Sequence, residues 1–434
     1  MSDSRLRAWP LTGVLLLYPL WWALGLGVLI FFAAAVPMAA ALIRERATGR
    51  PVHTPPAFLL WLLFLATVLF GLFTLGADPP GTVPGTAASR LVSYGFRFGG
   101  YAALTVVLVY AGNLSRRALP QRRLVALLAW LFAITVAGGV LGMAAPRFEF
   151  TAPIELLLPG HIRTMGFVQS LVHPSAAQIM DLIGGETPRP GAPWGYTNTW
   201  GNNVCLLVGW LLVAATTRRR RILAATVLTV AIAPIVYSLN RGLWIGLGVL
   251  VCYVAVRLAL RGRMSALLGV AAAGTALAVT LALTPLGGVV AARLDHGKSN
   301  GVRMYTTQRA IEGTLESPLI GFGSTRNTQG GRNSIAVGES ESCERCGNFT
   351  IGGNGQLWQL LFAHGLLGAA AYLGFFAVAL WRFRRDATPV GLAGSAAIVS
   401  TFAAMLWYNA LVTPLALTFL AYAAIWRNQG VSYR

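Results

Sequence analysis

Long apolar runs dominate this chain and leave few folds open to it. Residues 9–43 are almost continuously apolar, and later stretches of the same character alternate with short clusters of arginine. A helix needs about 20 mostly apolar residues to cross a bilayer. Only 11% of the 434 residues are charged, against about 25% in a soluble domain. We therefore expect an all-α, polytopic membrane protein embedded in a lipid bilayer.

The apolar runs predict about twelve membrane-spanning helices. The run at 9–43 is too long for one crossing, and we divide it near residues 20–25 into two helices. The other ten expected spans are 56–76, 91–112, 124–144, 197–217, 222–239, 243–260, 264–286, 357–381, 390–411 and 413–426. These spans group into three membrane blocks, separated by two large loops. The blocks are 1–144, 197–286 and 355–434, and the loops are 145–196 and 287–354.

The basic residues indicate how the spans are oriented. The net charge is +20, but the charges lie in short clusters between apolar runs, so we expect no nucleic-acid partner. With twelve spans and a cytoplasmic N-terminus, the cytoplasmic loops and tails carry 21 of the 34 basic residues, as the positive-inside rule requires. This pattern predicts a bacterial cytoplasmic (inner) membrane protein with both termini in the cytoplasm and both large loops outside.

Polar residues gather in the second large loop, 287–354. The loop contains the only lysine of the chain, several arginines and a Cys-x-x-Cys. In a protein that is otherwise mostly apolar, chemistry is expected where polar side chains collect. We therefore interpret this loop as the lid and much of the active site of a membrane enzyme, with an extracytoplasmic site.

Two arginines of this loop lie in a stretch that permits a helix. Residues 303–315 begin with Arg303, include Arg309, and end before Ser317-Pro318. Met304, Ala310 and Ile311 give this helix a modest apolar face. An ordinary solvated surface helix is the alternative interpretation. After it, residues 321–323 (GFG) predict a tight turn.

Arg241 interrupts the long apolar stretch 222–260. A charge at the bilayer centre is costly, so we place residues 240–242 (NRG) in a turn at the outer end of a span. An arginine there either extends to lipid headgroups or faces an anionic ligand. Guanidinium suits the second task, because its planar fork pairs with two phosphate oxygens at once. Arg163, in the first large loop, is a further candidate contact for the same anion.

Cys343 and Cys346 fall in an external loop under the expected topology. An oxidising compartment favours a disulfide between them. Two cysteines supply only two ligands for a structural zinc, so disulfide and metal remain alternatives, and we expect no metal. No phosphate-binding glycine loop and no paired acidic motif are present. We therefore expect no cofactor and no nucleotide-linked donor.

The order of several short motifs resembles the O-antigen ligase and O-antigen polymerase superfamily of bacterial membrane glycosyltransferases. The likeness covers most of the chain from about Arg163 onward. Its pieces are 163–167 (RTMGF), 198–202 (NTWGN) entering a span, 240–242 (NRG), Arg303 followed by 318–323 (PLIGFG), and 353–357 (GNGQL) followed by 365–368 (GLLG). Each piece is short, and their order and topology together are what is similar to the family.

The resemblance implies a function. Such enzymes take a glycan from a polyprenyl-pyrophosphate carrier in the outer leaflet and pass it to an acceptor glycan or glycolipid, without nucleotide or metal. The family's pyrophosphate-binding arginines match Arg241 and Arg303, which we predict to be the catalytic residues. Arg163, Arg309, Asn198 and Asn354 are the predicted substrate-binding residues.

One position departs from the family pattern. The family's loop histidine falls on Gly353, which cannot transfer a proton. The replacement bases that the sequence offers are Glu339, Glu341, Glu344, His296 and His364. His364 lies inside an expected span, and we expect it to be packed and hydrogen-bonded. The missing base keeps two other functions open: a transporter or flippase for lipid-linked glycans, and a non-catalytic binder of them.

Overall fold

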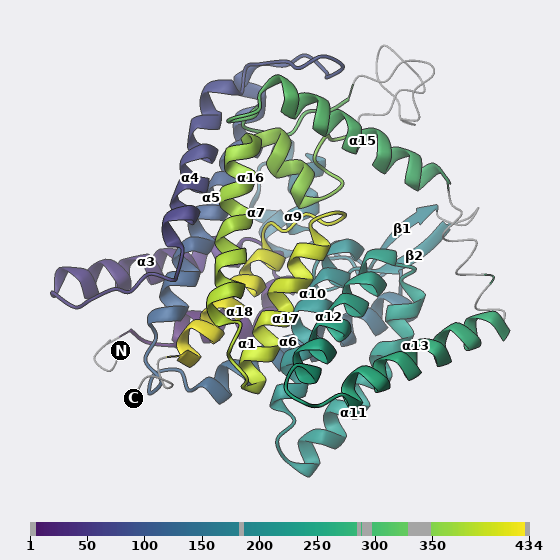
Figure 1. Cartoon of the computed structure of the whole chain (residues 1–434). Coiled ribbons are helices and arrows are strands. Elements are labelled where there is room, and N and C mark those ends of the chain that lie inside the picture. Colours follow the sequence, from purple (N-terminus) through teal and green to yellow (C-terminus); the bar gives the residue numbers. More distant parts are fainter. Residues whose placement is uncertain (1–5, 182–185, 284–287, 289–296, 329–348, 430–434) are drawn as a thin grey trace.

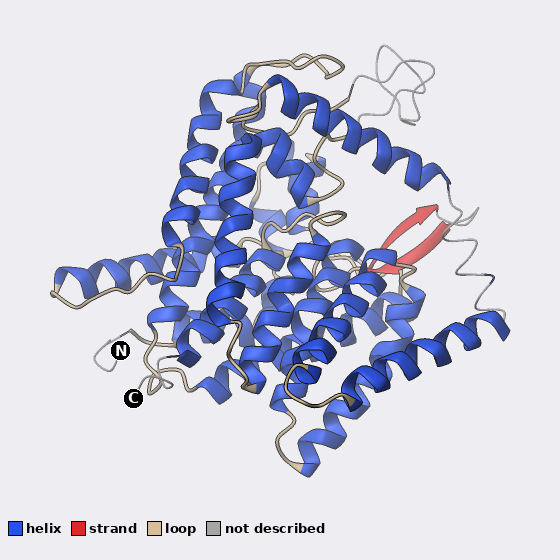
Figure 2. Ribbon diagram, in the orientation of Figure 1, coloured by secondary structure: helices blue, strands red, loops and turns tan. Residues whose placement is uncertain are grey.

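The computed structural model describes residues 6–181, 186–283, 288, 297–328 and 349–429. In this part of the chain the fold is all-α apart from one small hairpin (Figures 1 and 2). The helices are α1 (Trp9–Leu16), α2 (Tyr18–Ala23), α3 (Ile30–Ala47), α4 (Phe58–Phe70), α5 (Ala87–Asn113), α6 (Gln121–Ala144), α7 (Pro153–Leu157), α8 (Gly160–Arg163), α9 (Gly166–Val172), α10 (Thr197–Ala214), α11 (Arg218–Tyr237), α12 (Arg241–Ala259), α13 (Ser265–Leu283), α15 (Gly297–Glu316), α16 (Gln356–Phe383), α17 (Pro389–Ala404) and α18 (Thr413–Gln429), with a 3-10 turn η1 (Gly71–Thr74) after α4.

Every expected span overlaps a helix, but the helices differ in length. Within the described residues, five are long and apolar enough to cross a membrane: α5, α6, α11, α12 and α16. The apolar run at 9–43 is broken after α2, near Gly25, whose φ of +77° ends the segment. These findings indicate a multi-pass membrane protein, while the number twelve stays a prediction.

The surface of the bundle is apolar where lipid would cover it. Leu59 of α4 and Phe73 of η1 are 80% and 81% exposed, and many other large apolar side chains on the long helices are also exposed. Water-soluble monomers rarely leave so much contiguous apolar surface uncovered. This exposed apolar surface is what the apolar composition predicts for a protein embedded in lipid.

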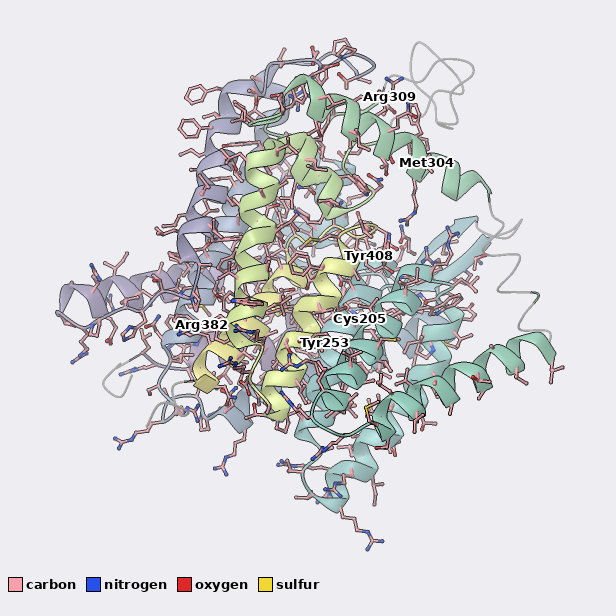
Figure 3. All side chains as sticks on the ribbon, in the orientation of Figure 1. Cys205, Tyr253, Met304, Arg309, Arg382 and Tyr408 are labelled. Carbon is pink, nitrogen blue, oxygen red and sulfur yellow. The ribbon has the colours of Figure 1, made fainter. Side chains whose placement is uncertain are left out.

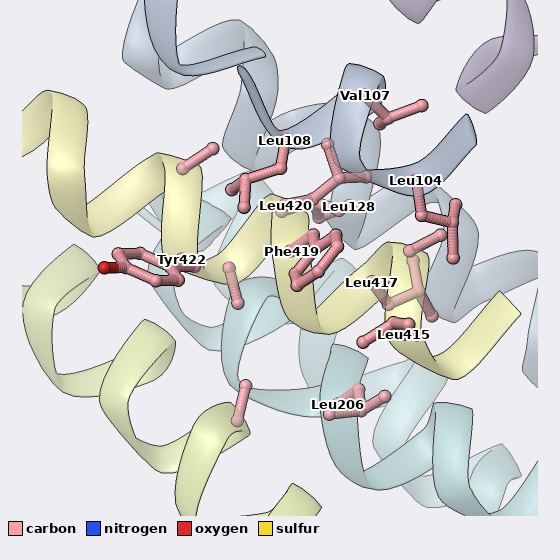
Figure 4. Packing of buried hydrophobic residues seen from close by; sticks show 14 of the residues in the cluster. Leu104, Val107, Leu108, Leu128, Leu206, Leu415, Leu417, Phe419, Leu420 and Tyr422 are labelled. Carbon is pink, nitrogen blue, oxygen red and sulfur yellow. The ribbon is translucent and has the colours of Figure 1, made fainter. Parts of the chain in front are cut away.

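The core is built around aromatic and leucine side chains. Trp61 of α4 is fully buried and donates to Thr105 Oγ1 at 2.7 Å. Its ring lies 5.3 Å from that of Phe375 in α16 and 4.9 Å from that of Phe419 in α18. Figure 4 shows Phe419 within the leucine-rich packing of α18. The last helix of the chain is thus a central element of the bundle.

Several basic loops meet at one end of the bundle, which we call the basic end. Arg257, at the end of α12, donates to the backbone oxygen of Asp386 at 3.0 Å. Arg116 donates to the backbone oxygen of Arg427 at 2.9 Å, and Asn428 Nδ2 donates to Asp386 Oδ2 at 2.8 Å. Loops 115–123, 257–263 and 382–389 and the tail at 427–429 therefore share one end. Figure 1 shows α11 beginning at the same end.

Helix α15 runs across the opposite end, which we call the α15 end (Figure 1). The sequence correctly predicted a helix here and one of the three residues of its apolar face, Ala310. Met304 and Ile311 are 71% and 45% exposed, whereas Ala310 is fully buried against Phe362 of α16. A Cβ on Gly313 would meet the Phe362 ring at 2.5 Å. Small residues, rather than large apolar ones, let α15 lie against α16.

The turn at 317–323 docks onto a kink in α16. Gly365 has φ +64° and ψ −171° inside that helix. The kink frees backbone groups, so that Phe322 N donates to Phe362 O at 3.0 Å and Leu366 N donates to Pro318 O at 2.7 Å. The tight turn predicted at 321–323 is confirmed, with Gly321 and Gly323 at φ +63° and +69°.

The first large loop contains a hairpin that the sequence did not predict. Strands β1 (Ala177–Asp181) and β2 (Glu186–Pro190) pair antiparallel, with Ala177 opposite Pro190. The short helices α7, α8 and α9 precede it. The hairpin matters because β2 carries Arg189 to the α15 end, as described next.

Candidate functional site

Arg241 stands at the first turn of α12, at the α15 end. The turn at 238–240 separates α11 from α12, and Asn240 caps α12 by accepting from Leu243 N at 3.5 Å. Gly242 follows, and a Cβ there would meet the Tyr408 hydroxyl at 2.5 Å. The predicted break between the two helices is confirmed, but the turn lies at 238–240, and residues 241–242, predicted as part of it, already belong to α12. A Cβ on Gly242 would also meet the Trp407 ring at 2.3 Å, so glycine lets Trp407 and Tyr408 lie against the backbone.

Arg303, on α15, lies at the same end of the bundle as Arg241. Its Nη1 donates to the backbone oxygen of Trp407 at 3.4 Å. Burial lowers the pKa of Arg303, and the nearby positive charge of Arg241 lowers that pKa further, while Tyr408 raises it. Arginine remains charged even so. Because Trp407 also packs against Gly242, the residue after Arg241, Arg241 and Arg303 share one end of the bundle.

Tyr408 lies against Gly242, the residue after Arg241. It is 3% exposed, its hydroxyl donates to Asn240 Oδ1, and it interacts electrostatically with Arg303 and with Arg189 of the hairpin. Arg189 is itself buried, and its Nε donates to the backbone oxygen of Ser238 at 2.7 Å. Figure 3 shows Tyr408 below α15, in the interior of the α15 end. We refer to Arg189, Arg241, Arg303 and Tyr408 as the arginine centre.

The loop at 405–412 is fixed to the start of α16. Gln356 N donates to Tyr408 O at 2.8 Å, and Gln356 Oε1 accepts from Ala410 N at 2.9 Å. Asn354 Nδ2 donates to Thr307 Oγ1 at 2.7 Å and to Arg303 O at 3.4 Å. These bonds hold the backbone on which Arg303 and Tyr408 stand, so Asn354 contacts the Arg303 backbone rather than its charge.

Arg241 and Arg303 bring two positive charges to the arginine centre. Among the described residues neither Arg241 nor Arg303 has a carboxylate within ion-pair distance. Both residues are half-buried, and two guanidinium groups at one end of the bundle favour an anion between them. No group of three His, Cys, Asp or Glu in the described ranges is placed to hold a metal ion. The chemistry on offer is therefore binding of an anion by guanidinium groups.

Three predicted contacts lie elsewhere or only near this centre. Arg309 pairs with Glu312 at 2.9 Å and approaches the loop at Gly81, so it does not point to Arg303. Arg163 is exposed at the end of α8, and none of its described bonds reaches the centre. Asn198 is in the first turn of α10, next to Thr197, whose oxygen accepts from Asn240 Nδ2 at 3.1 Å.

The position of the family histidine is close to the centre. Gly353 is exposed, and its backbone oxygen accepts from Asn409 Nδ2 at 3.1 Å. A Cβ on Gly353 would meet Thr350 O at 2.9 Å, so the local turn would have to shift to admit a side chain. The residue next to it, Asn354, carries no acid or base function.

His364 is not placed to act as the base. It is fully buried in α16, with its ring 5.6 Å from Phe64 and 6.4 Å from Tyr101. The packing was predicted correctly, but the expected hydrogen bond is wrong: within the described part of the chain neither ring nitrogen has a partner. The other candidate bases, His296, Glu339, Glu341 and Glu344, and the cysteines Cys343 and Cys346 lie outside the described residues.

Sequence reasoning missed Arg189 and Tyr408. Arg189 is one of many loop arginines, and only the hairpin brings it to Ser238. Tyr408 lies within the expected span 390–411, where a tyrosine is indistinguishable from an ordinary packing residue. Comparison with known proteins adds no assignment, since no protein-family model and no curated protein matches the chain.

Proposed function

We propose that this chain is a glycosyltransferase of the bacterial cytoplasmic (inner) membrane, similar to O-antigen ligases and polymerases. It moves a glycan from a polyprenyl-pyrophosphate carrier to an acceptor glycan or glycolipid at the outer leaflet. The site is extracytoplasmic, and both termini are cytoplasmic. No cofactor, metal or nucleic acid takes part.

The observation that carries the proposal is that Arg241 and Arg303 both lie beside the loop at Trp407 and Tyr408. They are 62 positions apart in the sequence, yet Arg303 donates to Trp407 O at 3.4 Å, and Gly242, next to Arg241, packs against Trp407 and Tyr408. A pyrophosphate spreads negative charge over several oxygens, and two planar guanidinium forks match it better than a single cation. Buried Arg189 also interacts electrostatically with Tyr408.

The proposed reaction uses these charges at the leaving group. The acceptor hydroxyl attacks the anomeric carbon, the bond from that carbon to the pyrophosphate oxygen breaks, and the hydroxyl proton passes to a base. Negative charge grows on the departing pyrophosphate, so preorganised guanidinium groups stabilise the transition state more than the ground state. The base is not among the described residues of the arginine centre.

A specific observation favours a second function, a non-catalytic binder of lipid-linked glycans. Gly353 stands where the family has its histidine, and His364 is enclosed in the bundle. A binder needs only the anion site. A transporter or flippase would need polar groups along a path through the bundle, whereas the arginine centre lies at one end.

A reconstituted assay separates these functions. The purified chain in liposomes receives a polyprenyl-pyrophosphate glycan and an acceptor, and both carrier release and acceptor gain are scored. A transferase gives both. Release without acceptor gain would show hydrolysis, and saturable binding with neither product would show a binder; either result contradicts the proposal.

The role of Arg303 is tested by comparing two variants with the wild type in the same assay. Arg303→Ala is expected to lower transfer roughly 100-fold or more while leaving expression intact, because it removes one oriented charge from the transition state. Arg219→Ala, an exposed arginine at the start of α11, controls for the loss of a positive charge. Full activity of Arg303→Ala would remove the assignment.

A further inference from the structure

A groove at the basic end combines two kinds of surface. It has a volume of about 770 Å³ and lies between the ends of α12 and α16 and the side of α17. Its apolar lining includes Leu260, Leu380 and Phe402, and its rim carries four arginines and two aromatic rings. The rim residues are Arg257, Arg261, Arg384, Arg385, Tyr253 and Trp381.

Two of the rim arginines are held in place by backbone oxygens. Arg257 and Arg261 donate to Asp386 O at 3.0 and 3.1 Å, and Arg261 also donates to Ala387 O at 3.2 Å. The Asp386 carboxylate turns elsewhere, to Thr388 and Asn428. The two guanidinium groups are thus positioned without being neutralised.

The opposite wall of the groove, at the end of α16, carries the other two rim arginines, Arg384 and Arg385. Arg384 lies 3.8 Å above the ring of Trp381 and donates to its backbone oxygen at 2.7 Å. Trp381 is 68% exposed, and tryptophan prefers the level of lipid headgroups. No Asp or Glu lines the groove. Its rim therefore complements an anion.

The apolar floor runs away from the rim into the bundle. Ala377 lies seven residues before Arg384 in α16, and Val399 lies ten residues after Pro389 in α17. At about 1.5 Å per residue these positions are roughly 10 and 15 Å along their helices. This is the depth over which an acyl chain, not water, is the neighbour of a membrane protein.

We propose that this groove binds an anionic phospholipid, with the phosphodiester headgroup between the four arginines and an acyl chain along the apolar floor. A basic pocket between membrane helices above apolar surface is suited to such a lipid. The site lies at the opposite end of α12 and α16 from the arginine centre, so it is independent of the proposed transfer reaction.

The test is lipid retention by the purified full chain in a neutral detergent, followed by native mass spectrometry. Phosphatidylglycerol is added, with phosphatidylcholine of the same chains as the neutral comparison. The wild type is expected to retain one phosphatidylglycerol at least about fivefold more than phosphatidylcholine. Equal retention of the two lipids would overturn the proposal.

Matched double variants locate the binding. Arg384→Gln with Arg385→Gln is expected to lower phosphatidylglycerol retention about fivefold. Neither side chain bonds to another helix in the described structure, so the fold should survive. Arg218→Gln with Arg219→Gln removes the same charge from an exposed cluster at the same end and should leave retention unchanged. Equal loss in both double variants would contradict a defined site.

A thermal shift distinguishes a lipid from a free anion. Phosphatidylglycerol is expected to raise the melting temperature of the wild type but not of Arg384→Gln/Arg385→Gln. Inorganic phosphate at the same concentration is expected to have no effect, because it cannot occupy the apolar floor. A shift by phosphate as large as that by the lipid would contradict the proposal.

Discussion

Tyr408 shows how a single side chain organises the arginine centre. Its hydroxyl donates to Asn240, the residue that caps α12 just before Arg241. Tyr408→Phe removes this donor and leaves Asn240 Oδ1 with one weak bond. We expect a loss of about 1–2 kcal/mol in stability, measured as a lower melting temperature in detergent. An unchanged melting temperature would show that the bond contributes nothing to the position of α12.

Asp78 and Arg90 form a second contact at the α15 end whose effect depends on pH. The hydrogen bond from Arg90 is the main cause that holds the pKa of Asp78 below its ordinary value of 3.8. A carboxyl with a lowered pKa in the folded state stabilises that state above the unfolded pKa and loses this contribution as pH falls through the folded pKa. The wild type should therefore become less stable below about pH 4.

The matching variant is Asp78→Asn. Because it removes the titrating group, its melting temperature should be lower at neutral pH and should fall less between pH 6 and pH 3 than that of the wild type. Glu316→Gln, an exposed carboxyl on α15, controls for the loss of a charge. The same pH dependence in the wild type and in Asp78→Asn would contradict the assignment.

At the residue scale, the sequence predicted some of the centre and not the rest. A charge inside an apolar run is costly, so Arg241 could be placed at a helix end from its position in the sequence alone. Arg303 was singled out by its polar loop and its motif. Arg189 and Tyr408 depend on long-range placement, through a hairpin and through the 405–412 loop, and no local pattern reports either.

Among the elements, the kink of α16 is what admits the 317–323 turn. The φ and ψ of Gly365 fall in a region that is essentially limited to glycine, and a Cβ there would meet Leu319 O at 2.5 Å. Gly365→Ala should therefore destabilise the protein by at least about 1–3 kcal/mol. Gly374→Ala on the same helix meets only a side-chain atom of Leu60 at 3.2 Å and should cost little. Equal melting temperatures for the two variants would show that the kink is not required.

Elements with a strong local sequence signal were predicted best. The long apolar helices and the turn at 321–323 follow from local sequence. The packed face of α15 was predicted correctly at Ala310 but wrongly at Met304 and Ile311, because Ala310 and Gly313 contribute close packing rather than large apolar area. The β1–β2 hairpin was missed because it pairs short, mostly polar segments within a loop.

For the whole molecule, the grouping of basic loops at one end predicts the orientation. In a chain whose native cysteines are replaced, Met304→Cys on exposed α15 should react with a membrane-impermeant maleimide added to intact cells. Arg219→Cys, at the basic end, should react only after the membrane is opened. The reverse pattern would invert the topology and place the arginine centre in the cytoplasm.

The proposed function depends on one anion site made by Arg241 and Arg303. Its most direct test is the affinity of the purified chain for a short polyprenyl pyrophosphate without glycan, measured by calorimetry. We predict that Arg241→Ala and Arg303→Ala each weaken binding about tenfold or more, that the double variant loses less than the sum of the two free-energy changes, and that Arg219→Ala binds like the wild type. Undiminished affinity in the double variant would contradict the site and the function built on it.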